Sequence, residues 1–307
     1  MSQNPDKSRN FFAATAVGAP SRADLAAELG EILVSAGMQD AQLRILADGA
    51  PWQACEYVFA ASEGDVEGLH GPLKGLPGVD VALLPVEGRR KRLLISDMDS
   101  TIIGQECLDE LADFAGLKAE VSAITERAMR GELDFEGALT TRVGMLKGLE
   151  LSALEAAYKE RITLNPGART LTATMKANGA HAVLVSGGFM FFTSRVAVAS
   201  GFDAHRGNTL VDDGTVLTGE VGRPILGREA KLTALDETAA AHGLARADAL
   251  ALGDGANDLD MIRAAGLGIA YHAKPIVAEQ ATAAIQHTDL TAALFFQGYA
   301  ADEFVTG

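Results

Sequence analysis

The sequence predicts an α/β protein with a doubly wound, mainly parallel sheet, a helical insert, and a smaller α+β unit in front. Residues 168–270 alternate between helical and apolar strand patterns, as expected for parallel strands joined by crossover helices. The apolar strand Leu93–Ser96 ends in the acidic run Asp97-Met98-Asp99. Residues 11–86 follow the order strand, helix, strand, strand, helix, strand, which is the ferredoxin-like pattern.

Hydrophobic spacing and turn residues place the elements of the first unit. Strands are expected at 11–18, 41–47, 54–61 and 79–86, and helices at 21–37 and 63–73. Ser21 is a predicted N-cap, because its hydroxyl can accept a hydrogen bond from a free N–H group of the first helical turn. Met1–Asn10 is polar, lacks the apolar stretch of a secretory signal, and is expected to be disordered.

The next segments are a basic run and a helical insert. Glu87–Arg92 is predicted to be a solvated hinge between two domains, since no aromatic residues accompany its charges as a nucleic-acid platform would require. Gln105–Arg161 is rich in helix formers and almost free of proline, which predicts helices interrupted at 131–134. Asn165-Pro166-Gly167 marks the end of this insert.

The remaining chain supplies the other strands and crossover helices. Helices are expected at 168–178, 190–200 and 228–242, strands at 182–185, 249–252 and 266–270, and a hairpin at 209–221. Because the carboxyl ends of parallel strands meet at one edge of a sheet, Asp97, Ser186 and Asp254 should gather there. Carboxylates at such an edge can provide a nucleophile, a general acid and ligands for Mg²⁺.

Bulk properties limit the classes of function. The chain has 307 residues, which favours two units. Its net charge of −15 argues against sequence-independent binding of nucleic acid. Cys55 and Cys107 are the only cysteines and form no CxxC pair, which predicts a reducing, cytoplasmic location without a disulfide framework. No run of about eighteen apolar residues occurs, so no membrane span is expected.

Four short stretches in a fixed order resemble the motifs of the haloacid-dehalogenase-like superfamily of phosphatases. They are Asp97-Met98-Asp99-Ser100-Thr101, Ser186-Gly187-Gly188, Lys231, and Gly253-Asp254 through Asp258. Within that superfamily the chain is similar to the phosphoserine phosphatases. The resemblance implies a phosphatase domain at 88–307 with a helical cap at about 105–163, and a degenerate ACT-like domain at 11–87.

The resemblance also implies a role for each acidic residue. Asp97 would attack phosphorus and form an aspartyl-phosphate, and Asp99 would protonate the leaving alkoxide and later activate water. Asp97, Asp254 and the backbone carbonyl of Asp99 would hold Mg²⁺, which prefers oxygen ligands. Asp258 would lie nearby, either as a ligand through water or as the residue that orients Lys231.

Phosphate recognition is expected from side chains and backbone near the strand ends. Lys231 would supply positive charge to the developing oxyanion. The hydroxyl of Ser186 and the N–H group of Gly187 would bind phosphate oxygens, and Asn257 would donate to the phosphate or hold its loop.

The insert is expected to choose the substrate. Glu106 would meet the ammonium group of phosphoserine, and Arg142 its carboxylate, since arginine binds carboxylates bidentately. The apolar residues Met129 and Phe135 would exclude water from the closed site. All four residues match the phosphoserine phosphatases in their spacing from Asp97.

The sequence therefore predicts Mg²⁺-dependent hydrolysis of O-phosphoserine to serine and phosphate, the last step of serine biosynthesis. One alternative is a phosphatase or phosphotransferase that acts on another small phosphomonoester. Another is an amino-acid-sensing protein with a vestigial catalytic domain. The ACT-like unit shows no specific ligand residue, so amino-acid binding and a scaffold or dimerisation role both stay open. A homodimer is consistent with such a unit.

Overall fold

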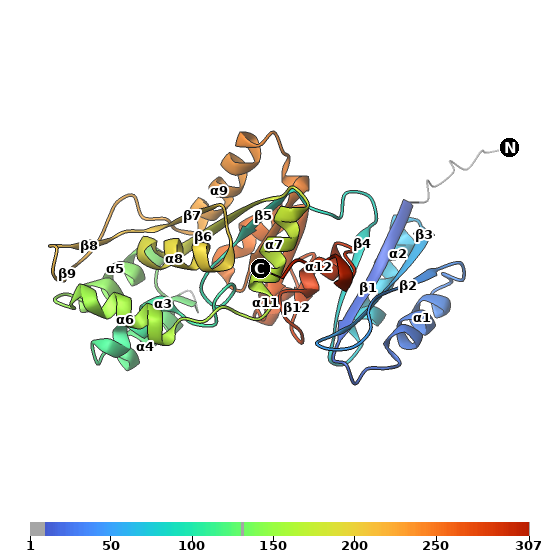
Figure 1. Ribbon diagram of the computed structural model, residues 1–307, viewed down its shortest axis with the longest axis horizontal. Helices are drawn as coiled ribbons and strands as arrows, with labels where there is room; N and C mark the ends of the chain where they lie inside the picture. The colour runs from blue at the N-terminus through green and yellow to red at the C-terminus, as the bar shows by residue number, and fades with distance from the viewer. Residues whose placement is uncertain (1–9, 130–131, 307) are drawn as a thin grey trace.

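The computed structural model describes residues 10–129 and 132–306, and only the backbone of residues 128 and 129. Figure 1 shows three parts in a row: an N-terminal antiparallel unit, a central parallel sheet, and a helical insert at the opposite end. The acidic runs that follow β5 (Leu93–Ser96) and β10 (Ala249–Gly253) lie in the central part, between the other two.

The N-terminal unit has the predicted order of strands and helices. Its elements are β1 (Asn10–Gly18), α1 (Leu25–Ser35), β2 (Gln42–Ala47), β3 (Gln53–Ala61), α2 (Glu63–Lys74) and β4 (Val79–Pro85). The strands form an antiparallel sheet in the order β2-β3-β1-β4. Helices α1 and α2 cover one face, with Leu29 and Leu69 in that core. The predicted ferredoxin-like pattern is confirmed.

Two details at the start of this unit differ from the prediction. Ser21 is not the N-cap of α1; the helix begins at Leu25 after Asp24. The N–H groups of Arg22 and Leu25 bond to earlier carbonyls in consecutive turns, and these turns delay the helix. Asn10 is not disordered but pairs with β3 as the first residue of β1. The predicted disorder of residues 1–9 lies outside the described residues.

The basic run Glu87–Arg92 is not a solvated hinge. Arg89 donates two hydrogen bonds, of 2.6 and 3.1 Å, to the carboxylate of Glu56, which is buried in the N-terminal sheet. Arg90 lies over the ring of Tyr299, 3.9 Å from its centroid. A buried carboxylate needs a cation, and the linker supplies one, so the run fastens the two parts of the chain together.

The central sheet is parallel and has six strands. Their spatial order is β12 (Ala283–Ile285), β11 (Leu267–Tyr271), β10 (Ala249–Gly253), β5 (Leu93–Ser96), β6 (His181–Phe189) and β7 (Ala204–Asn208). The doubly wound, parallel architecture is thereby confirmed. The sequence did not indicate the edge strands β7 and β12, and β6 continues past its predicted end at 185 as far as Phe189.

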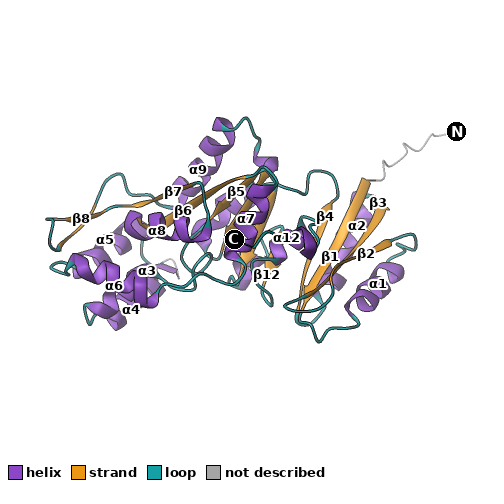
Figure 2. Cartoon of the chain, in the orientation of Figure 1, coloured by secondary structure: helices purple, strands orange, loops and turns teal. Residues whose placement is uncertain are grey.

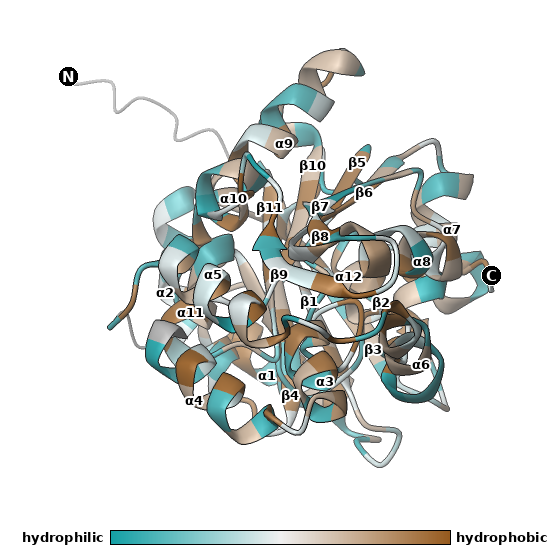
Figure 3. Ribbon diagram, turned by 90° about the vertical axis from the view of Figure 1, so that its left-hand side faces the viewer, coloured by the Kyte–Doolittle hydropathy of each residue, from teal (hydrophilic) through white to brown (hydrophobic). Residues whose placement is uncertain are grey.

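Helices cover both faces of this sheet (Figure 2). On one face, Leu94 and its neighbours pack with α7 (Ala168–Ala177), α8 (Met190–Ser200) and α12 (Ala292–Phe296). On the other, Leu93 and its neighbours pack with α9 (Arg228–Ala241) and α10 (Leu259–Ala264). Strands that are buried on both faces are apolar throughout, as the brown strands of Figure 3 show.

The insert and a hairpin form the end of the molecule that lies farthest from the N-terminal unit (Figure 1). The insert contains α3 (Cys107–Phe114), α4 (Lys118–Met129), α5 (Phe135–Met145) and α6 (Leu151–Arg161). The hairpin of β8 (Leu210–Asp212) and β9 (Leu217–Val221) packs against α5. Across the described ranges, no helix is long and apolar enough to cross a bilayer.

Candidate active site

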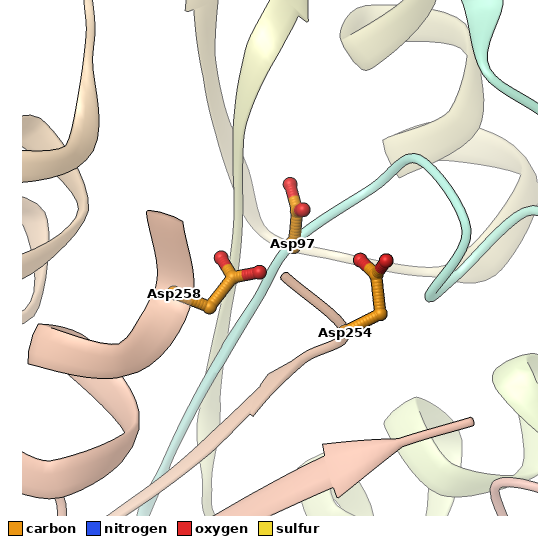
Figure 4. Close-up of side chains that lie close together, drawn as sticks. All are labelled: Asp97, Asp254 and Asp258. Carbon is orange, nitrogen blue, oxygen red and sulfur yellow. The ribbon is translucent and has the colours of Figure 1, made fainter. Parts of the chain in front are cut away.

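Three carboxylates meet at the carboxyl edge of the central sheet. Asp97 follows β5, and Asp254 follows the adjacent strand β10. Asp258 lies just before α10. One carboxylate oxygen of each residue lies within 4.8 Å of the others, and Figure 4 shows the three side chains grouped around one space. The chain reversal after β10 therefore brings all three acids to one point.

Lys231 reaches this cluster from α9. Its Nζ atom lies 2.8 Å from Oδ1 of Asp97 and 2.6 Å from Oδ1 of Asp258, and its side chain is 2% exposed. Burial alone would lower the pKa of Lys231, but the charges of Asp258 and Asp97 outweigh burial and raise it. The lysine therefore stays charged, and it is not a surface residue.

One lysine does not neutralise three acids. Burial and the charge of Asp258 together raise the pKa of Asp97 to about 7, and Lys231 partly opposes this increase. Burial, Asp97 and Asp258 raise the pKa of Asp254 to about 8. The cluster thus has an excess of negative charge and a set of hard oxygen donors, and these features fit a divalent cation.

Asp99 has the environment that a general acid needs. Burial, followed by the charges of Glu106 and Asp97, raises its pKa well above the ordinary value for aspartate. The backbone N–H of Cys107 donates to Oδ1 of Asp99 over 3.3 Å and holds the carboxyl group in place. The protonated form of Asp99 is therefore favoured, close to the cluster of Asp97, Asp254 and Asp258.

The loop after Asp97 contributes two contacts that sequence reasoning missed. Ser100 adopts a left-handed conformation, with φ of 54°, and its hydroxyl donates to Glu106 over 2.7 Å. The hydroxyl of Thr101 donates to Oδ1 of Asp254 over 3.3 Å. Both residues belong to the acidic motif Asp97–Thr101, and this position in the sequence is the signal that could have indicated their contacts with the site.

The end of β6 that follows Ser186 lies beside Asp99. The N–H of Gly188 donates to the Ser186 hydroxyl over 2.8 Å. A Cβ atom on Gly188 would lie 2.9 Å from Oδ2 of Asp99 and 3.0 Å from Oγ of Ser186, so a larger residue there would displace these two side chains. A Cβ atom on the neighbouring Gly187 would lie 3.0 Å from the ring of Phe135. The insert residue Phe135 therefore packs over the backbone that is expected to bind phosphate.

A cavity of about 910 Å³ opens from these residues toward the insert. The predicted site residues in its lining are Glu106, Phe135, Arg142, Asp254 and Asn257. Arg142 is 9% exposed and donates to the Thr125 hydroxyl over 2.9 Å. Burial lowers its pKa, while Asp109 and Glu106 oppose that change.

The structure brings most of the predicted residues into one region. Those in direct ionic contact or in the carboxylate cluster are Asp97, Lys231, Asp254 and Asp258. Asp99, Ser186 and Gly187 lie beside the cluster or under Phe135. The side chain of Met129 lies outside the described residues, so its predicted role is not tested. Sequence reasoning missed Thr125, and also Trp52, which lines the cavity from the N-terminal unit.

Comparison with known proteins identifies the family. Residues 94–263 match the family model of the haloacid dehalogenase-like hydrolases. A phosphoserine phosphatase from Polaromonas sp. is 46% identical over 226 residues, which are 71% of this chain and 96% of that protein. The chain belongs to the phosphoserine phosphatases of this family. The phosphoserine phosphatase of Streptomyces coelicolor is 39% identical over 295 residues, which are 94% of this chain and 71% of that protein.

Solved structures agree with this phosphatase assignment. A HAD family hydrolase from Salmonella enterica serovar Typhi matches 93% of this chain and 98% of its own, with a TM-score of 0.80 and 29% identity. A phosphoserine phosphatase described as a phospho-aspartyl intermediate analogue matches 67% of this chain and 98% of its own, with a TM-score of 0.63 and 40% identity. The predicted superfamily and enzyme class are confirmed. The phospho-aspartyl analogue structure has no counterpart for the remaining third of this chain.

Proposed function

We propose that this phosphatase hydrolyses O-phosphoserine to serine and phosphate with Mg²⁺, through an aspartyl-phosphate on Asp97. The observation that carries the proposal is the buried contact of Lys231 with Asp97 at the carboxyl end of β5, beside Asp254. A nucleophile, a fixed cation and an oxygen-rich metal site then surround one position, as phosphoryl transfer requires. The phosphoserine phosphatase relatives support the choice of substrate.

The carboxylates of Asp97 and Asp254, with the backbone carbonyl of Asp99, would hold Mg²⁺. The ion would neutralise phosphate charge that otherwise repels an anionic nucleophile. Asp258 accepts a hydrogen bond of 2.6 Å from Lys231, and this contact favours its role as the residue that orients the lysine.

One oxygen of Asp97 is better placed to attack than the other. Oδ1 accepts a hydrogen bond from the N–H of Met98 over 2.8 Å and lies 2.8 Å from Nζ of Lys231. Both contacts fix the carboxylate and leave Oδ2 as the attacking atom. Lys231 then stabilises negative charge on the transferring phosphoryl group.

Asp99 transfers protons in both halves of the reaction. Its raised pKa favours the protonated form, which donates to the leaving oxygen of serine as the ester bond breaks. The resulting carboxylate then accepts a proton from the water that attacks the aspartyl-phosphate. The hydrogen bond from Cys107 keeps Asp99 oriented through both steps.

Glu106 and Arg142 would recognise the amino-acid end of the substrate. Both line the cavity, and their opposite charges complement an ammonium and a carboxylate. Thr125 and the carbonyl of Ala138 each accept a hydrogen bond from Arg142 and restrict its guanidinium. Phe135 and the neighbouring glycine backbone would exclude water from the bound phosphate.

Phosphate release tests the proposal. Phosphoserine should be hydrolysed with Mg²⁺ and should not be hydrolysed after chelation. Arg142→Ala should lower kcat/KM for phosphoserine about ten- to a hundredfold, because it removes a charge-assisted contact of about 1.5–3 kcal/mol. The loss should be much smaller for phosphoethanolamine, which has no carboxylate. Equal losses on the two esters would contradict the assigned role of Arg142.

The same substrate panel separates the alternatives. A stronger response to another phosphomonoester, or a transfer product formed with an added alcohol, would favour the second hypothesis. Absence of any phosphate release would favour the amino-acid-sensing protein, although the intact set of Asp97, Asp99, Lys231 and Asp254 argues against it. A homodimer, a cytoplasmic location and a step in serine biosynthesis stay predictions.

A further inference from the structure

The catalytic cavity extends beyond the carboxylates to the N-terminal unit. Apolar groups from three separate segments contribute to its lining: Trp52 from the loop between β2 and β3, Pro166 after the insert, and Ile276 and Val277 of α11 (Pro275–Ala278). We call these four residues the outer end. The cavity is continuous from the outer end to Asp254, so one molecule can contact both.

Trp52 presents an apolar surface to this space. Its indole is partly buried against the main core, and its Nε1 atom is fully buried without a hydrogen-bond partner among the described residues. Because the polar atom is hidden, the exposed part of the indole is its hydrocarbon ring. Ile276 is 64% exposed. Exposed apolar groups that gather in a cleft mark a contact surface for a ligand.

A buried carboxylate of the N-terminal unit fixes one wall of the cavity. Asp80 of β4 accepts hydrogen bonds from the N–H of Gln286 at 2.7 Å, and from the N–H and hydroxyl of Thr288 at 2.9 and 2.6 Å. Thr288 and Asp289 line the cavity. The fold itself therefore holds this part of the cavity wall in place.

The size of the cavity exceeds what phosphoserine needs. A volume of about 910 Å³ falls near the upper limit of pockets that hold drug-sized ligands. Phosphoserine is much smaller, and Glu106 and Arg142 would keep it at the end near the insert. The outer end would then stay unfilled by the proposed substrate.

We propose that the outer end is a subsite for the aromatic or other apolar group of a larger phosphomonoester, whose phosphate lies at Asp97. This inference rests on the proposed function, because the ester is hydrolysed by the same two-step reaction. Asp97 displaces the aryl oxygen from phosphorus, Asp99 protonates that oxygen, and water then releases phosphate from Asp97. The apolar group packs on the ring of Trp52 and beside Ile276.

The test compares 2-naphthyl phosphate with phosphoserine as substrates of the full chain with Mg²⁺. Trp52→Ala should lower kcat/KM for the naphthyl ester about tenfold, the effect of one lost aromatic contact with its buried area. It should leave kcat/KM for phosphoserine nearly unchanged. Trp52→Phe should restore most of the naphthyl activity, since it keeps an aromatic surface. Ile45→Ala is the matched control, because Ile45 is 52% exposed on β2 but does not line the cavity.

The outcomes that overturn the subsite differ from those that overturn the proposed function. Equal losses on both esters would make Trp52 a structural residue, and a gain on the naphthyl ester would make it a barrier. Failure of the wild type to hydrolyse or bind the naphthyl ester would also remove the subsite. Inactivity of the wild type toward phosphoserine would instead refute the proposed function. If Trp52→Ala does not fold, Ile276→Ala provides the test, with a twofold to threefold selective loss on the naphthyl ester.

Discussion

Two pairs of buried or half-buried carboxylates show how the same residue type serves different purposes in this molecule. In the N-terminal unit, Glu56 is paired with Arg89, and Asp80 accepts backbone and hydroxyl hydrogen bonds from residues 286–288. At the catalytic edge, Asp97 and Asp254 lie close to Asp258 and share one nearby lysine. The first pair is satisfied by its partners, whereas the second is left with an excess of negative charge.

This difference separates structural acids from reactive acids. Satisfied carboxylates stabilise the junction of the two parts of the chain. Crowded carboxylates with raised pKa values cost stability near neutral pH, and they provide the charge that a metal ion and a phosphoryl transfer need. Mutation of the catalytic pair should therefore reduce mainly activity, and mutation of the N-terminal pair should reduce mainly stability.

The largest expected effect is on activity alone. Asp97→Asn should reduce turnover of phosphoserine about 10⁴-fold or more, because it removes the nucleophile from a set of residues that act as a unit. Its melting temperature should stay the same or rise, since the change removes a charge from the crowded cluster. Phosphate release and thermal unfolding would measure the two effects. Turnover that survives the substitution would contradict the covalent mechanism.

Lys231→Met should lower activity and stability together. It leaves Asp97 and Asp258 buried without their cation, which should reduce the free energy of unfolding by about 3–5 kcal/mol. Chemical denaturation would measure this loss. Arg246→Met is the control, because its pair with Asp236 is exposed and screened by solvent, and its loss should change the free energy of unfolding little. Similar losses in the two variants would show that burial does not strengthen the catalytic pair.

Glu56→Gln should affect stability without affecting turnover. The substitution weakens two charge-assisted hydrogen bonds from Arg89, and a loss of about 1.5–3 kcal/mol is expected. The kcat for phosphoserine should change little, because Glu56 does not line the catalytic cavity. A large fall in kcat at unchanged stability would erase the distinction between the two pairs of acids.

The last expected effect is a dependence of stability on pH in the metal-free protein. The folded pKa values of Asp97 and Asp254, about 7 and about 8, lie above the value of about 3.9 for an unfolded aspartate. Between these values the folded state binds more protons, so the contribution of both groups to stability is largest below pH 4 and is lost as pH rises toward 8.

Thermal unfolding with a chelator present, from pH 5 to pH 8, would reveal this slope. Asp254→Asn should reduce it, and added Mg²⁺ at pH 8 should raise the melting temperature of the wild type but not of the variant. A slope that Asp254→Asn leaves unchanged would place the responsible groups elsewhere in the chain.

The sequence predicted the catalytic edge well because its signals are local. An apolar strand followed at once by Asp97, and another followed by Asp254, place both acids by the geometry of parallel strands alone. The N-cap at Ser21 was wrong because turns within residues 19–25 compete with the helix. The spacing of hydrophobic residues gives no information about this competition between turns and a helix.

Contacts between the two parts of the chain could not be predicted. The cation for Glu56 comes from the linker, and the wall held by Asp80 belongs to residues 286–288, about two hundred positions away. Trp52 likewise reaches a cavity formed mainly by other segments. No sequence spacing predicts these contacts, because they form only when the N-terminal unit packs against the rest of the chain.

The linker contacts both parts of the chain, through Arg89 with Glu56 and through Arg90 with Tyr299, and these contacts limit which truncations the enzyme can tolerate. A truncated variant that begins after Arg90 would lose the guanidinium that lies over Tyr299. It would also expose to solvent the surfaces of α12 and β12 that pack against β1 and β4. The backbone N–H groups of Gln286 and Thr288 would lose their acceptor as well. A phosphoserine phosphatase of known structure matches only 67% of this chain over 98% of its own length, whereas removal of the N-terminal unit from this chain should lower the stability of what remains.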